Sequence, residues 1–577
     1  MSNAEGASAA PAAGRARVPI ARRTVDAALG CLLFVLGVAL CLHYGRMGFM
    51  PLDQSIAWDA GWRILGGQVP FRDFVTTTSL VPGALQAAVF AVAGVSWLAY
   101  CAHAAVANGV FAAGVFALLR GEGLHPALAA GFGAASAVFF YPPFGVPYGD
   151  QHSFLFGLLA LLVASAAGRA SSRCSLLLFA LVPVLLLLGY LSKPVPVGFL
   201  VPAVAVAALW PAADRLRPRV LALLAGALVS VAAVVVALAS AGADLALAWD
   251  YLVTMPLESG GRRALYPGWL GDRVRALLQL GGRSGMVFPP SAAAASAVGL
   301  AGVAALAVGG RDAGEGKSAP VRPLVTALLL WAATALFVGV TRNQARNGHA
   351  LLPVVLGLLA SSLALVARAA AALRGGRSPV ISGLKDLAAW GSVALAFVAL
   401  HDAVRFNATV NATRMVHDAG YDPRRAAAAR GALPPALDFL EWGLASTRYS
   451  PRDLTALVDA VAAQPAPVLL VSDSLVVYAL AGKPSVNPNL WYHPGVSMPR
   501  PDDRPRIERL DALFIERLED ASPGLVVFDP PPGPRFRLEM LPRTSSWLRA
   551  RRCAAFAIGP FPSWRLCPDG ATLADSP

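Results

Sequence analysis

The sequence predicts an α-helical polytopic membrane protein with a soluble α/β domain at its C-terminus. Hydrophobic residues make up 56% of the 577 residues, and charged residues only 14%. A soluble protein carries about 25% charged residues. So few charges cannot cover a water-exposed surface of this size, and most of the surface is therefore expected to face lipid. The apolar residues also gather in runs of helical length up to residue 401, after which polar residues and Pro become more frequent.

The apolar runs set the number of membrane crossings. They lie at 25–44, 79–95, 97–119, 126–141, 151–168, 174–191, 195–210, 220–241, 289–310, 323–340, 349–368 and 383–401. Basic residues mark every second connection from residue 150 onward, at 169–173, 215–219, 311–322 and 368–377. The positive-inside rule places these connections in the cytoplasm, and it places the polar segments between them outside. This pattern accounts for the net charge of 48 − 34 = +14 without nucleic acid as a partner.

The front of the chain does not follow this alternation. An arginine-containing N-terminal tail, 1–24, is expected in the cytoplasm, which puts the connection at about 45–79 outside. Three crossings between 79 and 141 would then contradict the later pattern. One run in this stretch is therefore expected to be half-buried or re-entrant. The total should be odd, eleven or thirteen transmembrane helices.

Three domains follow from these patterns: the tail 1–24, a transmembrane domain 25–401 and an extracytoplasmic α/β domain 402–577. In the last domain, 467–472 and 524–529 are predicted strands, and 473–482 is a predicted helix. No GxGxxG or P-loop occurs, so a nucleotide site has no support. Cys553 and Cys567 are candidates for a disulfide if the domain faces an oxidising compartment.

The connection at 45–79 holds the first group of candidate functional residues. Apolar residues at helical spacing, with Trp58 and Trp62 four apart, predict an amphipathic helix on the membrane surface with Trp at headgroup level. Carboxylates at such a surface serve as general bases or hold a divalent metal. The other interpretation is a solvated loop with helix caps and surface ion pairs. The residues concerned are Asp53, Asp59, Arg72 and Asp73.

Three further groups lie on the same predicted side. Asp150 and His152 are candidate metal ligands or polar partners of the first loop, or Asp150 is simply a helix N-cap. Lys193, between two apolar runs, either contacts a lipid phosphate or extends its ammonium to the interface. A third group breaks the positive-inside trend and fits an anionic headgroup, a pyrophosphate or an anionic lipid surface: Arg342, Arg346 and His349.

Taken in order, these segments resemble the GT-C membrane glycosyltransferases, in particular the protein O-mannosyltransferase-like and lipid A aminoarabinose transferase-like families. Asp53 followed by Leu65-Gly-Gly-Gln-Val-Pro70 is similar to their first outside loop. Tyr148–His152 resembles a second acidic motif, and Leu191-Ser-Lys193 resembles a helix break. Gly348-His-Ala-Leu-Leu-Pro353 sits where the family has a polar residue before a Leu-Pro helix start. The chain departs from the family at Gln54, where the family has Glu, and at 80–83, which replaces Pro-Pro-Leu.

The resemblance implies transfer of a sugar from a polyprenyl-phosphate donor to a periplasmic or cell-envelope acceptor, which is a lipid, a glycan or a protein. It implies inverting chemistry, with Asp53 as the base or as the carboxylate that orients the acceptor, and with Asp150 and His152 completing the site. Lys193, Arg342 and Arg346 would hold the phosphate, and the remaining candidates for substrate binding are Asp59, Arg72, Asp73 and His349. A divalent metal ion is a candidate cofactor. The departures at Gln54 and 80–83 leave open both the use of a metal and the identity of the acceptor.

The main alternative is a transporter or flippase of a lipid-linked or small-molecule substrate. It predicts internal repeats and paired broken helices, and the sequence shows no repeated segment. The high Ala and Arg content is typical of a GC-rich bacterium. The expected location is therefore the bacterial inner membrane, with the N-terminus cytoplasmic and the C-terminal domain periplasmic.

Overall fold

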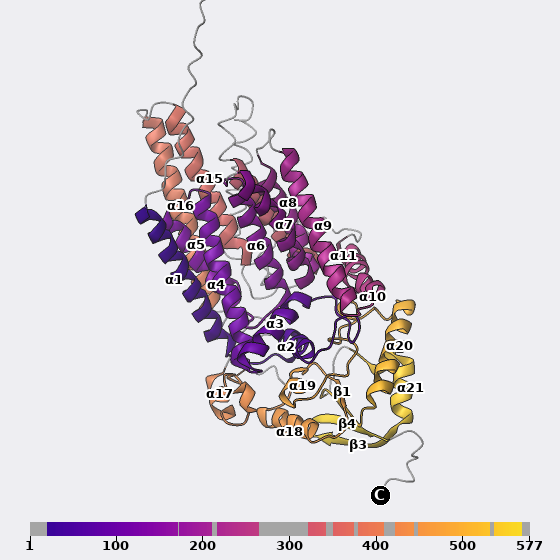
Figure 1. The fold of residues 1–577 in the computed structure, drawn as a ribbon. Helices are drawn as coiled ribbons and strands as arrows, with labels where there is room; N and C mark the ends of the chain where they lie inside the picture. Colours follow the sequence, from indigo (N-terminus) through magenta and orange to yellow (C-terminus); the bar gives the residue numbers. More distant parts are fainter. Residues whose placement is uncertain are drawn as a thin grey trace, which may run out of the picture.

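The computed structural model in Figure 1 shows a long helical bundle with a small mixed domain packed on one end. It describes residues 20–170, 172–210, 216–264, 321–341, 350–373, 379–408, 422–443, 448–530 and 536–567. The bundle comes from the residues up to 408. The four β-strands of the described residues all follow it in sequence.

Six helices of the described residues are long and apolar enough to cross a membrane. They are α1 (Ile20–Gly45), α4 (Trp97–Gly121), α6 (Gly149–Ala167), α7 (Ser172–Ser192), α9 (Leu216–Ser240) and α16 (Pro379–Phe406). Further apolar helices accompany them: α3 (Leu80–Ala93), α5 (Pro126–Phe139), α8 (Pro194–Leu209), α14 (Val321–Thr341) and α15 (Leu352–Leu373). All of these helices fall on apolar runs predicted from the sequence. The run at 289–310 lies outside the described residues.

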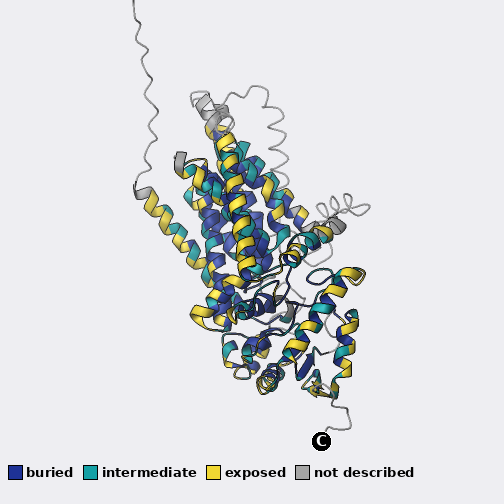
Figure 2. Cartoon of the chain, turned by 45° about the vertical axis from the view of Figure 1, so that its right-hand side comes forward, coloured by how far each residue is buried: buried dark blue, intermediate teal, exposed yellow. Residues whose placement is uncertain are grey.

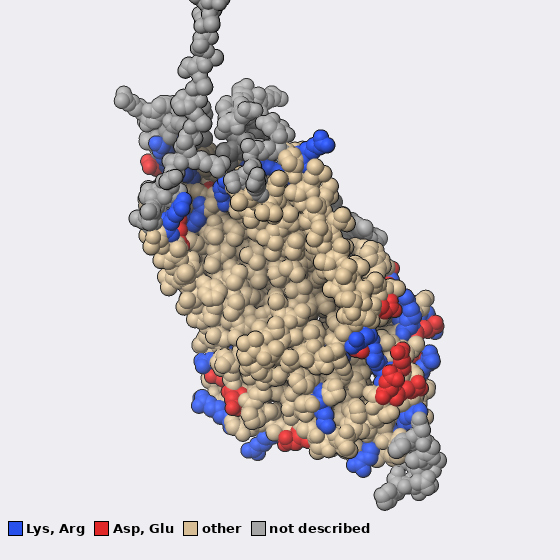
Figure 3. Space-filling model, viewed as in Figure 1, with Lys and Arg blue, Asp and Glu red and all other residues tan. Residues whose placement is uncertain are grey.

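The sides of the bundle are apolar. Figure 3 shows a broad band without Lys, Arg, Asp or Glu around the middle of one face, with charged side chains above and below it. Leu177 and Leu228 each expose 73% of their surface, whereas the centre of the bundle is filled by buried residues (Figure 2). Apolar surface is unfavourable in water by about 25 cal/mol per Å². These faces therefore fit lipid, and the bundle has the character of a helical membrane protein.

The end of the bundle away from the small domain is held by ion pairs. Arg120 pairs with Asp26 at 2.9 Å and ties α4 to α1. Glu122, just after α4, pairs with Arg322 at 2.7 Å and with Arg169 at 3.6 Å. Arg169 and Arg322 belong to two of the basic connections that the sequence places on one side of the membrane. The structure brings these connections together at one end.

Helix α3 begins and ends at the other end of the bundle. At its start, the backbone N–H of Ser79 donates to the carbonyl of Ser192, the last residue of α7, at 2.8 Å. Just after its end, Trp97 donates Nε1–H to the carbonyl of Gly45, the last residue of α1, at 3.0 Å. The 14-residue helix therefore does not run the length of the bundle. It is the apolar run between 79 and 141 whose crossing conflicts with the charge pattern.

The connection between α1 and α3 contains the predicted helix, α2 (Pro51–Leu65), which begins with Pro at a position that favours helix starts. Its environment differs from the prediction. Trp58 is fully buried and packs edge-on against Phe90 and Tyr100, and Trp62 donates to the carbonyl of Lys483 at 2.8 Å. The expectation of a surface helix with Trp at headgroup level was wrong, because helical spacing does not distinguish a lipid neighbour from a protein neighbour.

The C-terminal domain is built on a four-stranded sheet of order β1-β2-β4-β3. β1 (Val468–Val471) and β2 (Leu525–Phe528) are the two strands predicted from the sequence, and they pair in parallel. Parallel strands need a long crossover, which α20 (Arg504–Ala521) supplies. β3 (Arg552–Ile558) and β4 (Phe561–Leu566) form an antiparallel hairpin. The remaining elements are α17 (Pro423–Ala429), η7 (Pro435–Leu437), α18 (Pro451–Ala462), α19 (Val476–Leu480), η8 (Leu538–Met540) and α21 (Pro542–Ala550).

The cysteine pair singled out in the sequence closes this hairpin. Cys553 and Cys567 form a disulfide, with their Cα atoms 5.6 Å apart. This Cα separation lies in the usual range for bonded cysteines.

The C-terminal domain shares hydrophobic cores with the membrane-side segments. One core joins Phe71 and Val75 of the first connection, Leu191 of α7 and Leu469 of β1. It also includes the helix that follows α9, which consists of α10 (Leu245–Trp249), a π-helical turn η2 (Asp250–Thr254) and α11 (Met255–Ala264). The domain is therefore packed directly on the bundle end rather than tethered beside it.

Candidate functional site

Three helix starts meet at the bundle end that faces the C-terminal domain. The starts of α3 and α8 are joined by the hydrogen bond from Ser79 N–H to the carbonyl of Ser192. At the start of α6, a Cβ added to Gly149 would lie 3.0 Å from that same carbonyl and 3.6 Å from Cβ of Lys193. A side chain at this position would require its neighbours to shift by a few tenths of an ångström. The N-termini of helices carry partial positive charge and free N–H groups, so this meeting point favours a negatively charged group.

Lys193 occupies the break between α7 and α8. Its backbone is extended, with φ −165° and ψ 126°, because Pro194 disfavours a helical conformation in the residue before it. Its Nζ lies 2.8 Å from Oδ1 and 3.0 Å from Oδ2 of Asp150. The Asp150 side chain is fully buried, while 20% of the Lys193 side chain is exposed. The carboxylate thus holds the ammonium in place.

Beside this ion pair, His152 belongs to a buried chain of hydrogen bonds. The Tyr141 hydroxyl contacts Nδ1 of His152, Nε2 of His152 lies 3.0 Å from Nε2 of His103, and Nδ1 of His103 lies 2.9 Å from Oε1 of Gln86. The Gln86 carbonyl oxygen accepts, so His103 donates from Nδ1. Nδ1 of His152 also lies 3.3 Å from the carbonyl oxygen of Tyr148. His152 is fully buried, so it acts on its neighbours rather than on a substrate.

Asp53 lies in the first turn of α2, and its side chain is outside the described part of the structure. The next residue fixes where this turn sits. Gln54 accepts from the N–H of Met50 at 2.8 Å and donates to the carbonyl of Phe144 at 3.0 Å. The Phe144 ring stacks on Tyr148 at 4.4 Å, and Lys193 Nζ lies 5.8 Å from the Tyr148 ring centre. The segment 140–148 therefore connects the start of α2 to the Lys193 ion pair.

Asp59 is held inside the protein by Arg63. The two side chains are fully buried and lie 2.6 Å apart, between Arg63 Nε and Asp59 Oδ2. Arg63 also donates to the carbonyl of Asn487 in the C-terminal domain at 2.5 Å. Burial raises the pKa of Asp59, and the neighbouring guanidinium only partly offsets this rise. This arrangement joins α2 to the C-terminal domain and leaves Asp59 no access to a substrate.

Arg72 and Asp73 form a separate group on the outer side of the first connection. Asp73 accepts from Arg72 Nη2 at 2.7 Å and from the backbone N–H of Val69 at 2.6 Å, and Arg517 of α20 lies 3.2 Å away. Burial raises the pKa of Asp73, but these hydrogen bonds and charges outweigh it and lower the pKa below its usual value. Both residues stabilise the loop, and neither contacts the Lys193 ion pair in the structure.

The structure thus assembles only part of the set proposed from the sequence. Asp150, His152 and Lys193 lie together, and the helix carrying Asp53 is linked to them through the segment 140–148. Asp59, Arg72 and Asp73 hold the loop on the C-terminal domain. Arg342, Arg346 and His349 lie outside the described residues. Within the described ranges, no three His, Cys, Asp or Glu side chains come close enough to hold a metal ion.

The sequence reasoning missed Tyr141, His103 and Gln86. One signal was available, because His103 and Gln86 are polar residues within apolar runs, and polar groups at such positions mark functional or structural networks. Tyr141 carried no such signal.

Chemically, the site offers one fixed ammonium, several helix N-termini and a nearby acidic helix turn at the end of an apolar bundle. Such a site suits an anionic group delivered from the lipid phase, beside a hydroxyl that needs a base. Comparison with protein-family models and with curated proteins finds no match to this chain.

Proposed function

We propose that this protein is an integral membrane glycosyltransferase of GT-C type that moves a sugar from a polyprenyl-phosphate donor to a cell-envelope acceptor. The observation that supports this most is the Lys193–Asp150 ion pair, which holds an ammonium where the starts of α3, α6 and α8 converge. A phosphate leaving group needs fixed positive charge beside it, and a lipid donor reaches such a site sideways through the bilayer. No nucleotide-binding element is then required.

In this proposal each residue has a distinct task. Lys193 and the helix starts hold the donor phosphate, and Asp150 keeps the ammonium in place. The Asp53 carboxylate removes the proton of the acceptor hydroxyl while the hydroxyl oxygen attacks the anomeric carbon. The bond from that carbon to the phosphate oxygen breaks, the electron pair stays on the phosphate, and the configuration at the anomeric carbon inverts. His152 contributes indirectly by fixing Tyr141 and the segment 140–148.

The same proposal places the chain in a bacterial inner membrane with an odd number of crossings, eleven or thirteen. The arginine-rich bundle end, with Arg120, Arg169 and Arg322, faces the cytoplasm. The C-terminal domain then faces the periplasm, where the Cys553–Cys567 disulfide is stable.

Sugar transfer by the purified protein in lipid vesicles tests this function. Wild type would be compared with Asp53→Asn and Lys193→Gln, using radiolabelled polyprenyl-phosphate sugars and a membrane extract as acceptor. Loss of the base should lower the transfer rate about 10²–10⁴-fold, and loss of the ammonium about 10²–10³-fold. Lys385→Gln, at an exposed position of α16, should transfer like wild type.

Lys193→Gln leaves Asp150 buried without its partner, so folding needs its own control. The double variant Asp150→Asn/Lys193→Gln removes both charges and should fold like wild type while transferring as poorly as the single variant. Full transfer by either variant would remove Lys193 from the mechanism. A wild type that moves no sugar but carries a lipid-linked solute across the vesicle membrane would instead establish the transporter alternative.

A further inference from the structure

The helix at 245–264, which comprises α10, η2 and α11, has one face that no described part of the protein covers. Leu245, Trp249 and Leu257 expose 41%, 65% and 66% of their surfaces. On another face, Tyr251 and Met255 are buried in the core shared with the C-terminal domain. A large exposed Trp and Leu on one stripe of a helix are unusual on a water-facing surface.

The π-helical turn aligns this stripe. In a regular α-helix, residues eight apart point in directions about 80° apart. The turn at Asp250–Thr254 accommodates one extra residue. Two residues eight positions apart on either side of the turn are therefore separated by about seven α-helical steps. Their side-chain directions then differ by only about 20°. Trp249 and Leu257 therefore share one face. By the same spacing, Asp250 and Glu258 share the neighbouring face.

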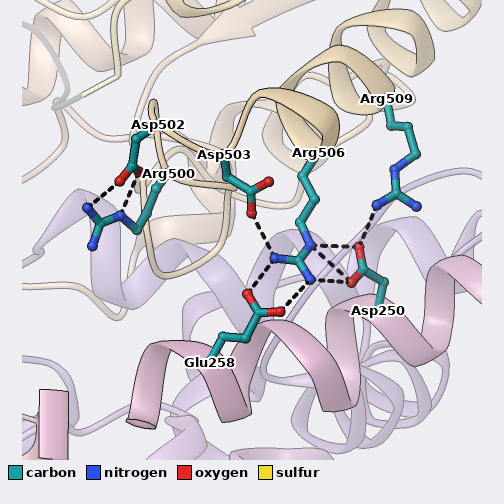
Figure 4. Close-up of polar contacts among 7 residues, drawn as sticks. All are labelled: Asp250, Glu258, Arg500, Asp502, Asp503, Arg506 and Arg509. Atoms are coloured by element: carbon teal, nitrogen blue, oxygen red, sulfur yellow. Dashed lines mark hydrogen bonds and ion pairs between the residues drawn. The ribbon is translucent and has the colours of Figure 1, made fainter. Parts of the chain in front are cut away.

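The acidic face is covered by the C-terminal domain. Arg506 of α20 lies 2.8 Å from Asp250 and 2.7 Å from Glu258, and Figure 4 shows both carboxylates converging on its guanidinium. Asp503 contacts the same guanidinium at 2.7 Å, and Arg509 lies 3.3 Å from Asp250. Only 12% of the Arg506 side chain is exposed. Asp250 and Glu258 thus face α20 of the C-terminal domain, and the apolar stripe is turned away from it.

The stripe continues the lipid-facing surface of the bundle. α9 exposes leucines along its length, among them Leu224 and Leu228, and it ends at Ser240, only a few residues before Leu245. In Figure 3 the charged atoms over α10, α11 and α20 gather at the edge of the uncharged band. A Trp at the border between apolar and charged surface is typical of the headgroup level of a bilayer.

We propose that helix 245–264 lies in the membrane interface, with Trp249 and Leu257 inserted among the lipids and with Arg506 holding its polar face on the C-terminal domain. The partner of this surface is the lipid bilayer itself. Because the helix also belongs to the core shared with the C-terminal domain, it fixes the height of that domain above the membrane. This inference requires only that the bundle spans a bilayer, and it stands apart from the proposed glycosyltransferase activity.

Depth-dependent fluorescence quenching tests the position of the helix. Cys31 and Cys174, which are exposed and free, would be replaced by Ala. Trp249→Cys or Leu257→Cys would then be labelled with a small fluorophore in phosphatidylcholine vesicles. The quenchers are nitroxide lipids labelled near the glycerol or near the acyl-chain end, and aqueous iodide. Leu228→Cys in α9 and Phe556→Cys in β3 serve as controls for the lipid core and for water.

Labels at 249 and 257 should be quenched most by the shallow nitroxide, the label at 228 by the deep one, and the label at 556 by iodide alone. Strong iodide quenching at 249 and 257 would place the stripe in water and overturn the proposal. Strongest quenching by the deep nitroxide would make the segment part of a span and would also overturn it. Protection from all three quenchers would mean that protein covers the stripe, and this result would also overturn the proposal.

The role of Arg506 is tested in the Leu257→Cys protein. Arg506→Gln removes the shared partner of Asp250 and Glu258, so iodide quenching at 257 should rise at least about twofold as α11 loosens. Arg500→Gln removes an exposed ion pair with Asp502 in the same region (Figure 4) and should change nothing. Equal quenching in both variants would show that Arg506 does not hold the helix.

Discussion

Replacing Arg63 by Met should loosen the junction between α2 and the C-terminal domain. Arg63 is fully buried, pairs with Asp59 at 2.6 Å, donates to the carbonyl of Asn487 and lies 5.0 Å from the Phe74 ring centre. Methionine preserves much of the apolar packing of the arginine stem. What it removes is the counter-charge of Asp59 and the hydrogen bond to Asn487.

The expected loss is large. Breaking a buried ion pair from one side costs about 3–5 kcal/mol, because the remaining charge stays buried without compensation. For a unit of about 150–250 residues, this corresponds to a fall in Tm of about 6–20 °C. The double variant Asp59→Leu/Arg63→Met removes both charges and should recover most of the loss, since apolar replacements of buried pairs are often neutral or better.

Thermal unfolding in detergent, followed by tryptophan fluorescence, measures these effects. The burial-raised pKa of Asp59 adds a second signature. Without Arg63 this pKa should rise further, so protonation of the carboxyl on acidification, at pH values above 3.8, should relieve part of the loss in Arg63→Met and none in the double variant. Equal Tm values for the single and double variants, or no pH relief, would refute the account, because the loss would then come from packing alone.

Three further outcomes are expected. Asp73→Asn should lower Tm at neutral pH, and the difference from wild type should shrink as the pH falls below 3.8 and vanish below the lowered pKa of the native carboxylate, where that group is protonated. Cys553 and Cys567 should resist a membrane-impermeant alkylating reagent until a reductant is added, as mass shifts would show. Gly109→Leu should lower Tm by several degrees, because a Cβ there would lie 2.7 Å from the Phe34 carbonyl of α1.

Local patterns in the sequence predicted much of the fold. The continuous apolar runs at 467–472 and 524–529 became β1 and β2 because both strands are buried in the domain. The apolar runs before residue 401 that lie in the described residues became helices because they are buried or face lipid. The charge alternation also predicted that one run between 79 and 141 does not cross, although it did not identify α3, whose composition is as apolar as that of a spanning helix.

The site was harder to predict because its residues come from distant parts of the chain. Asp150 and Lys193 are 43 residues apart and meet only because α6, α7 and α8 pack together at their ends. The sequence predicted only that both residues lie on the same side of the membrane, and it did not predict that they are in contact. The Asp59–Arg63 pair, by contrast, has the i, i+4 spacing of helical ion pairs and was within reach of sequence reasoning. The burial of this pair could not be predicted from the sequence, because it depends on the C-terminal domain.

The contacts between the first connection and the C-terminal domain can form only after the end of the chain has been synthesised. Trp62 and Lys483 are 421 residues apart, and Arg72 and Arg517 are 445 apart. At ribosomal speeds of about 5–20 residues per second, the first segment waits about 20–90 s for its partner. During that interval Arg63 and Trp62 lack the contacts that the C-terminal domain makes with them. The nascent chain therefore exposes an aggregation-prone surface until its last third is made, so truncation late in the chain should compromise the earliest loop first.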